Sequence, residues 1–191
     1  MATRSKKRNK ILTLTIDLAR IFNRIGVDRE PSVRRQLRDQ LTSVELQQQF
    51  GLKVIELIKK KTRASNDYRN KPFKQYAKSY IESAVFKLYG KKPNVNLTLT
   101  GEMLTSMVSK STGATSLTIS FIGKKVNDRA HGHTFGIKSK KYGKVIRDFF
   151  NITQEEEDEI LRGLLQDRAV EEDEDLLAEH FLLQLQTTGG V

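Results

Sequence analysis

The chain has 191 residues, of which 37% are hydrophobic and 30% are charged, a balance typical of a soluble globular protein. It contains no cysteine, which excludes disulfide bonds and thiolate metal sites and argues against a secreted fold stapled by bridges. The formal net charge is +11, so the chain attracts polyanions or acidic protein surfaces.

The first ten residues form a basic arm, but the features that would make it a signal peptide do not follow. Residues 11–17 alternate apolar and polar side chains, without a continuous apolar stretch or a cleavage site. No stretch approaches the roughly 20 apolar residues that span a bilayer, so we expect a soluble, unprocessed chain with no membrane partner. The arm is either a solvated tail or an electrostatic tether. Its polyanion-facing residues would be Arg4, Lys6, Lys7 and Arg8.

A strand and a helix are predicted next. Leu12, Leu14 and Ile16 alternate with threonines, and this period of two indicates a half-buried strand. Asp17 is placed to cap the following helix, and Gly26 to end it with a left-handed residue. The apolar face of this helix comprises Leu18, Ile21, Phe22 and Ile25.

Residues 31–61 have a helical pattern that begins at Pro31, a residue suited to a first turn. Thr42-Ser43-Val44-Glu45 has the form of a capping box, so the region is one long helix or two nearly collinear ones. Gly51 lies on the apolar stripe, where the missing side chain permits a close backbone approach. The stripe comprises Val33, Leu37, Leu41, Val44, Leu52, Ile55 and Ile58.

Residues 62–76 have the composition of a loop, interrupted by aromatic rings from Tyr68 to Tyr80. Rings interleaved with basic side chains favour single-stranded nucleic acid bound by stacking and charge. The alternative, which we prefer, is that the rings pin a long loop to the body. The basic residues that would face a polyanion are Lys60, Lys61, Arg63, Arg69, Lys71 and Lys74.

Short strands dominate the pattern between residues 94 and 150. Alternation over 94–100 predicts a strand, followed by a short helix over 101–107 and a hairpin over 108–120. A helical turn over 125–130 precedes short strands that begin at Phe135 and Val145. We therefore expect an α+β fold, in which an antiparallel sheet of about four strands packs against long N-terminal helices.

The C-terminal part is helical and acidic. Thr153 and Glu156 form a capping box that predicts a helix over 153–165. Residues 1–150 carry +21 and residues 151–191 carry −10. We divide the chain into a basic arm (1–10), an α+β domain (11–165) and an acidic docking extension (166–191). Docking on a partner is expected through Leu177, Phe181 and Leu185.

Catalytic motifs are scarce. No serine lies in a G-x-S-x-G elbow, no phosphate-binding loop occurs, and the histidines number three. His131 and His133, beside Asp128, would lie on one side of a strand and are a weak metal signal. We favour polar packing in a turn for them. We expect no enzyme, no cofactor and no metal site.

Three motifs, in order, resemble a family of tailed-phage proteins. Residues 96–104, Asn-Leu-Thr-Leu-Thr-Gly-Glu-Met-Leu, resemble the L-x-x-T-G-x-L/M signature of phage virion-morphogenesis, tail-completion and neck proteins. Ala130, followed by residues 133–136, resembles A-x-x-H-x-F-G. Residues 147–153 resemble R-x-F-x-G-x-T, with Asn151 where the family has glycine. The resemblance covers residues 10–165.

The resemblance implies a non-enzymatic structural virion protein at the head–tail joint, in the neck or as a tail-completion subunit. Such proteins assemble as rings through which the genomic DNA passes, between connector or portal-side proteins and tail-tube-side proteins. The chain would then reside in the virion, and in the host cytoplasm during assembly. Two other classes stay open: a basic non-virion nucleic-acid-binding protein, and a metal-dependent hydrolase centred on His131 and His133.

Overall fold

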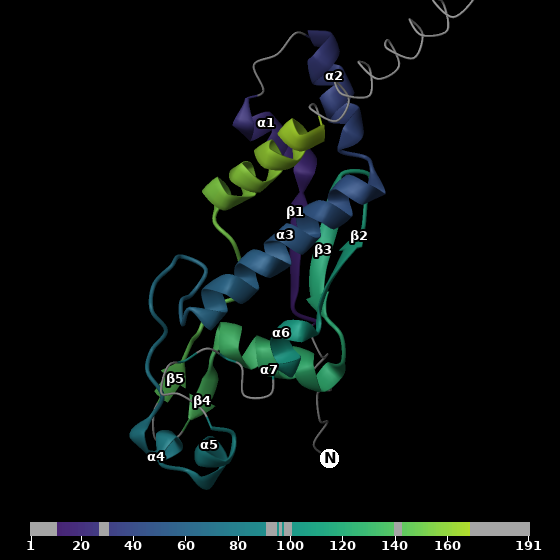
Figure 1. Cartoon of the computed structure of the whole chain (residues 1–191). Coiled ribbons are helices and arrows are strands. Elements are labelled where there is room, and N and C mark those ends of the chain that lie inside the picture. The colour runs from purple at the N-terminus through teal and green to yellow at the C-terminus, as the bar shows by residue number, and fades with distance from the viewer. Residues whose placement is uncertain are drawn as a thin grey trace, which may run out of the picture.

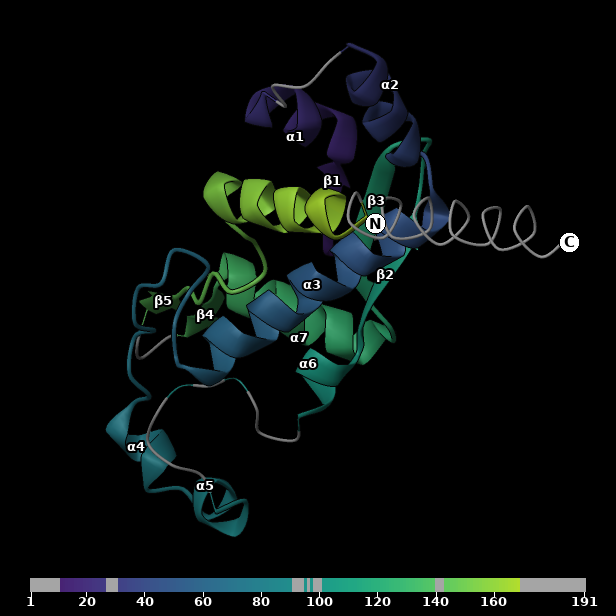
Figure 2. The same ribbon diagram turned by 45° about the horizontal axis from the view of Figure 1, so that its top comes forward.

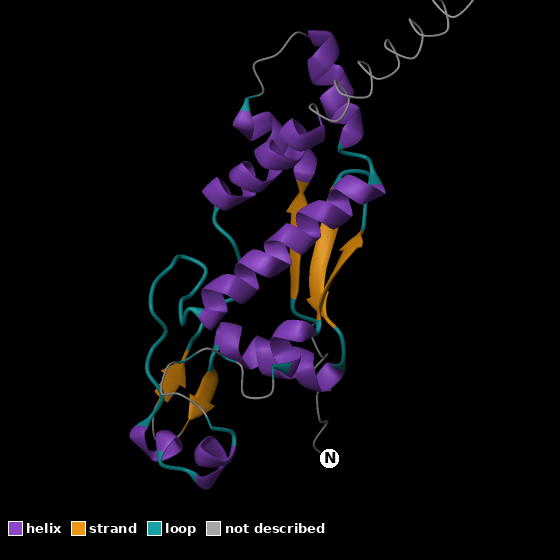
Figure 3. Ribbon diagram, viewed as in Figure 1, coloured by secondary structure: helices purple, strands orange, loops and turns teal. Residues whose placement is uncertain are grey.

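The computed structural model describes residues 11–26, 31–90, 95, 97, 101–139 and 143–168. This part of the chain is mixed α+β, as expected, with a three-stranded antiparallel sheet, a two-stranded ribbon and several helices (Figures 1 and 3). A fourth strand in the main sheet is not found within these ranges. The strand predicted over residues 94–100 lies mostly outside them, although Val95 and Leu97 are buried.

The sheet has the order β1-β3-β2, so the central strand is the returning strand of the predicted hairpin. β1 spans Thr13–Asp17, β2 spans Met107–Ser111 and β3 spans Ser116–Phe121. In the register, Ile16 lies opposite Leu117 and Leu14 lies opposite Ile119. The apolar residues of β1 and β3 therefore share one face of the sheet, and the threonines and serines of these two strands share the other. The predicted alternation and the predicted hairpin are both confirmed.

Helix α1 (Leu18–Ile25) begins directly where β1 ends. The Asp17 carboxylate accepts a hydrogen bond from the backbone N–H of Ala19 at 3.0 Å, and Gly26 ends the helix at φ 56°. All four residues of the predicted apolar face are buried. The strand, the cap and the helix were thus correctly predicted from local signals.

Two helices, α2 (Pro31–Gln40) and α3 (Val44–Arg63), occupy the region of the long helical pattern. The chain breaks at the predicted capping box, with Ser43 as the cap. The two helices run in clearly different directions and are not collinear (Figures 1 and 2). Val44 and Leu52 were wrongly placed on the apolar stripe, since they are 57% and 58% exposed.

Helix α3 crosses the apolar face of the sheet diagonally (Figure 1). It is rotated so that Phe50, Val54 and Ile58 face the core, all completely buried. The buried surface of the helix also includes Gly51, as the sequence predicted for a close approach. The long helix on one sheet face forms one part of the core, to which α1 and residues 149–165 also contribute.

The remaining helices are shorter: α4 (Lys78–Ile81), α5 (Ala84–Leu88), α6 (Glu102–Thr105) and α7 (Lys124–Phe135). Helix α7 is longer than the predicted turn. Phe135 is its last residue and does not begin a strand, because the turn comes at Gly136, where φ is 88°. None of the described helices has the length and apolar character of a membrane-spanning segment.

The last described elements are a ribbon, β4 (Ile137–Ser139) paired with β5 (Gly143–Val145), and a helix over residues 154–168. The predicted capping box of that helix is confirmed. The backbone N–H of Thr153 donates to Oε2 of Glu156 at 3.0 Å, and the N–H of Glu156 donates to Oγ1 of Thr153 at 3.4 Å. Leu161, Leu164 and Leu165 of this helix enter the core.

Candidate functional site

The helix over residues 154–168 is fastened to α1 by an ion-pair cluster. The Nη2 atom of Arg24 lies 2.9 Å from Oε2 of Glu157 and 2.5 Å from Oδ1 of Asp158. Hydrogen bonds to Asp158, and then to Glu157, raise the pKa of Arg24. Glu157 is only 8% exposed. These two carboxylates are therefore paired within the fold and are not free surface charge.

Lys61 was predicted to face a polyanion, but its side chain is buried. Its side chain is 7% exposed, Nζ donates to the carbonyl oxygen of Tyr68 at 2.6 Å, and the ammonium pairs with the carboxylate of Glu156. A lysine held in this way does not present its charge on the surface. It therefore does not belong with the polyanion-facing residues predicted from the sequence.

The other predicted basic residues of this region are exposed. The guanidinium of Arg69 lies 4.9 Å from the centroid of the Tyr68 ring, a cation–π contact at the surface. The remaining exposed residues of this set are Lys60, Arg63, Lys71 and Lys74. Arg4, Lys6, Lys7 and Arg8 lie outside the described residues, as do Leu177, Phe181 and Leu185.

The rings of the loop after α3 pack largely inward, as the preferred alternative predicted. Phe73 is 6% exposed. The ring of Tyr76 lies 5.1 Å from that of Tyr80 and 6.0 Å from that of Phe86, centroid to centroid. These rings stabilise a small lobe around α4 and α5. They are therefore not free, as a set, to stack on bases.

We define the basic lobe as residues 69–90, 137–139 and 143–147. It contains α4, α5, β4 and β5, which lie together at the end of the molecule away from α1 and α2 (Figures 1 and 2). In sequence it holds eight Lys and Arg residues and one acid, Glu82. The lobe is thus strongly basic in composition.

Arg147 connects the two parts of the basic lobe, which are the segment 69–90 and the ribbon of β4 and β5. Its guanidinium lies 5.2 Å from the centroid of Tyr76, and its backbone N–H donates to the carbonyl of His133 at 2.8 Å. Burial lowers the pKa of Arg147. Burial also raises the pKa of Tyr76, against the opposing effect of Arg147. Among the described residues, Nε of Arg147 has no hydrogen-bond partner.

An exposed apolar face completes the lobe. Val85, Leu88 and Tyr89 are 49%, 81% and 52% exposed; the first two lie three residues apart on α5, and Tyr89 caps its C-terminal end. Phe86, on the other side of the helix, is buried. An exposed apolar group within a strongly charged region is the kind of surface that binds other proteins.

His131 and His133 lie on α7, not on a strand. The ring centroid of His131 is 4.6 Å from that of Phe135, which is packing within one helix. Within the described ranges, no group of three or more His, Asp or Glu residues is arranged to hold a metal ion. The strand geometry behind the metal hypothesis was therefore wrong.

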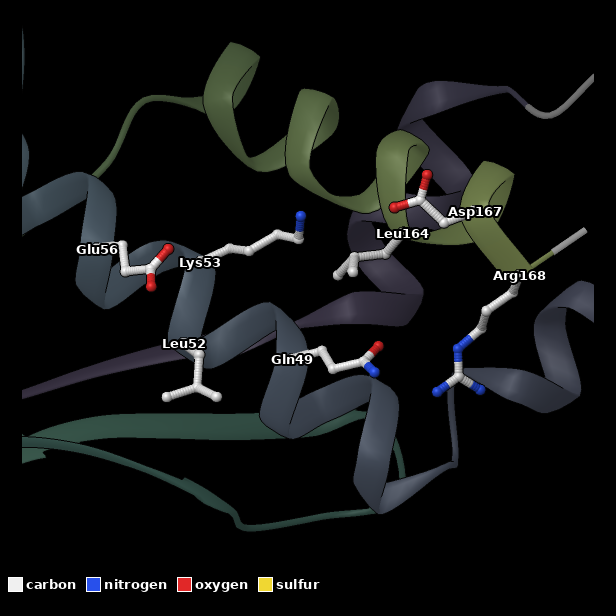
Figure 4. A pocket seen from close by; sticks show the side chains of 7 residues that line it. All are labelled: Gln49, Leu52, Lys53, Glu56, Leu164, Asp167 and Arg168. Atoms are coloured by element: carbon white, nitrogen blue, oxygen red, sulfur yellow. The ribbon is translucent and has the colours of Figure 1, made fainter. Parts of the chain in front are cut away.

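A groove of about 380 Å³ lies between α3 and the helix over residues 154–168 (Figure 4). Two cationic and two anionic side chains line it, so the groove has no net charge with which to select a ligand. Its lining comprises Gln49, Leu52, Lys53, Glu56, Leu164, Asp167 and Arg168.

With this geometry established, we compared the chain with known proteins: no protein-family model, curated protein or solved structure matches it.

Proposed function

We propose that the chain is a structural subunit of a tailed-phage particle at the head–tail joint, in the neck or as a tail-completion protein. Identical copies form a ring around the DNA channel and bridge connector or portal-side proteins to tail-tube-side proteins. The subunit holds other proteins and catalyses no reaction.

The observation that carries this proposal is the division of charge along one chain. The basic lobe exposes apolar residues at one end of the fold. Residues 169–191 contain six acids and no Lys or Arg. Two unlike, complementary surfaces on one subunit favour head-to-tail association, and such contacts close into rings when the rotation allows.

The proposal retains a domain over residues 11–165, flanked by the basic arm 1–10 and the acidic docking extension 166–191. It also retains a fourth strand in the main sheet and passage of genomic DNA through the ring.

The test is to purify the full chain and to determine its mass by sedimentation velocity, with negative-stain imaging of the same sample. We expect rings with a central opening. We also expect the chain among the proteins of purified phage particles, labelled by antibody at the joint between head and tail. A monomer at all concentrations, absent from particles, would overturn the proposal.

A second candidate is a basic non-virion nucleic-acid-binding protein, favoured by the exposed Lys60, Arg63, Arg69, Lys71 and Lys74 after α3. Such a protein binds DNA as a monomer, with an affinity that falls steeply with salt. Fluorescence anisotropy with single-stranded DNA, titrated with NaCl, distinguishes the two. A ring subunit alone should bind weakly.

A further inference from the structure

Helix α5 exposes an apolar face although the helix itself is held in place by a buried side chain. Leu88 is 81% exposed, whereas Phe86, two residues earlier, is 4% exposed. The ring of Phe86 meets that of Tyr80 edge-on, with centroids 5.4 Å apart. The helix is therefore fixed by one side and exposes the other, and large exposed apolar groups on a fixed element are typical of binding surfaces.

The surroundings of this face select for an acidic partner. The basic lobe, to which α5 belongs, holds in sequence eight Lys and Arg residues and one acid. Lys74, Lys78 and Lys87 are exposed near the apolar face in the chain. Nζ of Lys78 lies 3.9 Å from Oε1 of Glu82, and the Lys78 side chain is 91% exposed. A bound partner would need both carboxylates and apolar side chains.

The same chain contains a segment with that composition. Residues 171–185 begin with five consecutive acids, Glu171 to Asp175, and add Glu179, with no Lys or Arg. Leucines and Phe181 follow within the same stretch. Three acids of the preceding helix are different, because Glu156, Glu157 and Asp158 are paired within the fold. The acidic segment is thus the complement of the basic lobe in both charge and apolar content.

We propose that residues 171–185 of one copy dock on the α5 face of a second copy, with Leu177 and Phe181 against Val85, Leu88 and Tyr89. This inference rests on the proposed function, since it names the contact that joins neighbouring subunits. The C-terminal end of the helix over residues 154–168 and α5 lie at opposite ends of the molecule (Figures 1 and 2). A contact between such distant surfaces joins successive copies head to tail.

Two full-length variants test the contact. Leu88→Glu places a carboxylate in the receiving face, and Phe181→Glu removes the main apolar group of the docking segment. Each variant alone is expected to be monomeric where the wild type is oligomeric. Leu88 is exposed, so its replacement leaves folding intact. The matched control is Leu52→Glu, at a 58% exposed leucine on α3, which should leave the oligomer unchanged.

Mixing the two variants gives the sharpest result. The Leu88 variant still donates an intact C-terminal segment, and the Phe181 variant still has an intact receiving face. We expect a 1:1 dimer by native mass spectrometry that grows no further. Docking of the segment on its own copy would instead leave the mixture monomeric, which would overturn the inference.

The outcomes separate this inference from the proposed function. Rings that survive Leu88→Glu refute the α5 contact and leave the ring subunit in place. A wild-type protein that is monomeric and absent from particles refutes both. If the basic lobe instead binds DNA, the double variant Lys78→Gln/Lys87→Gln should lose DNA binding and keep its oligomeric state. That result also counts against the docking contact.

Discussion

Gly51 on α3 lies so close to Ser109 on β2 that a Cβ atom added to Gly51 would be 2.0 Å from the Oγ of Ser109 and 2.5 Å from its Cβ. Helix and sheet are therefore in direct backbone-to-side-chain contact at this point. Both distances are far below any van der Waals separation, so a larger residue at position 51 must push the helix away from the strand.

Gly51→Ala is expected to lower the free energy of unfolding by about 1–3 kcal/mol, because overpacking outweighs the better helix propensity of alanine. The matched control is Gly163→Ala, in the helix over residues 154–168, where an added Cβ meets nothing within 4 Å. That change should stabilise by about 0.5–1 kcal/mol. Urea titrations of both variants measure these changes in unfolding free energy. A change of the same sign in both variants would contradict the close approach.

The ion pairs of Arg24 provide a second prediction. Arg24→Gln leaves the nearly buried carboxylate of Glu157 without its main partner, and we expect a loss of about 2–3 kcal/mol in unfolding free energy. Arg20→Gln is the control, since Arg20 is 3.9 Å from Glu157 and its side chain is 64% exposed. It should cost less than about 0.5 kcal/mol. Equal losses for the two variants would refute a cluster centred on Arg24.

Lys60 and Lys61 are adjacent but should behave oppositely. Lys61→Met removes the partner of Glu156 and is expected to destabilise the fold by about 2–3 kcal/mol. Lys60→Met, at an exposed position, should change stability little and should weaken any polyanion binding. Thermal unfolding and heparin affinity, measured on both variants, check the two effects. Unchanged stability in the Lys61 variant would refute its burial in an ion pair.

Asp148 should give a pH-dependent effect. Burial, and then the charge of Asp67, raise the pKa of Asp148 in the folded chain. Its ionised form is therefore penalised by folding, and the penalty is present above the folded pKa and absent below the usual value of 3.8. Asp148→Asn is expected to stabilise at pH 7, by less than about 1 kcal/mol because the group is partly solvated.

The advantage of the Asp148 variant should disappear as the pH falls below the usual Asp range. Asp128→Asn, at an exposed carboxylate on α7, serves as the control and should change stability by less than about 0.5 kcal/mol at any pH. Urea unfolding at a series of pH values measures both. A gain for the Asp148 variant that persists at low pH would contradict the assignment.

Local signals accounted for the parts of the fold that the sequence predicted well. The alternation before Asp17, the cap at Asp17, the hairpin after residue 107 and the Thr153–Glu156 capping box each depend on residues a few positions apart. Such patterns are present in the sequence itself, because the partners are neighbours along the chain.

The errors have a common cause in long-range packing. The side chain of Arg24 bonds to Glu157, 133 residues later in the chain, and no local pattern links them. Lys61 appeared to be surface charge because its partners, the Tyr68 carbonyl and Glu156, become neighbours only after folding. For the candidate site, the sequence indicated the basic character of the lobe, whereas the exposed face of α5 required the burial of Phe86 to be known.

The attachment of the helix over residues 154–168 has a mechanical consequence. Arg24 fastens it to α1 and Lys61 fastens it to α3, and both contacts are made within the first five residues of the helix. A pulling force applied beyond Arg168 would be shared between those two anchors. Because α1 continues directly from β1, the load on the Arg24 anchor would also reach the hydrogen bonds between β1 and β3.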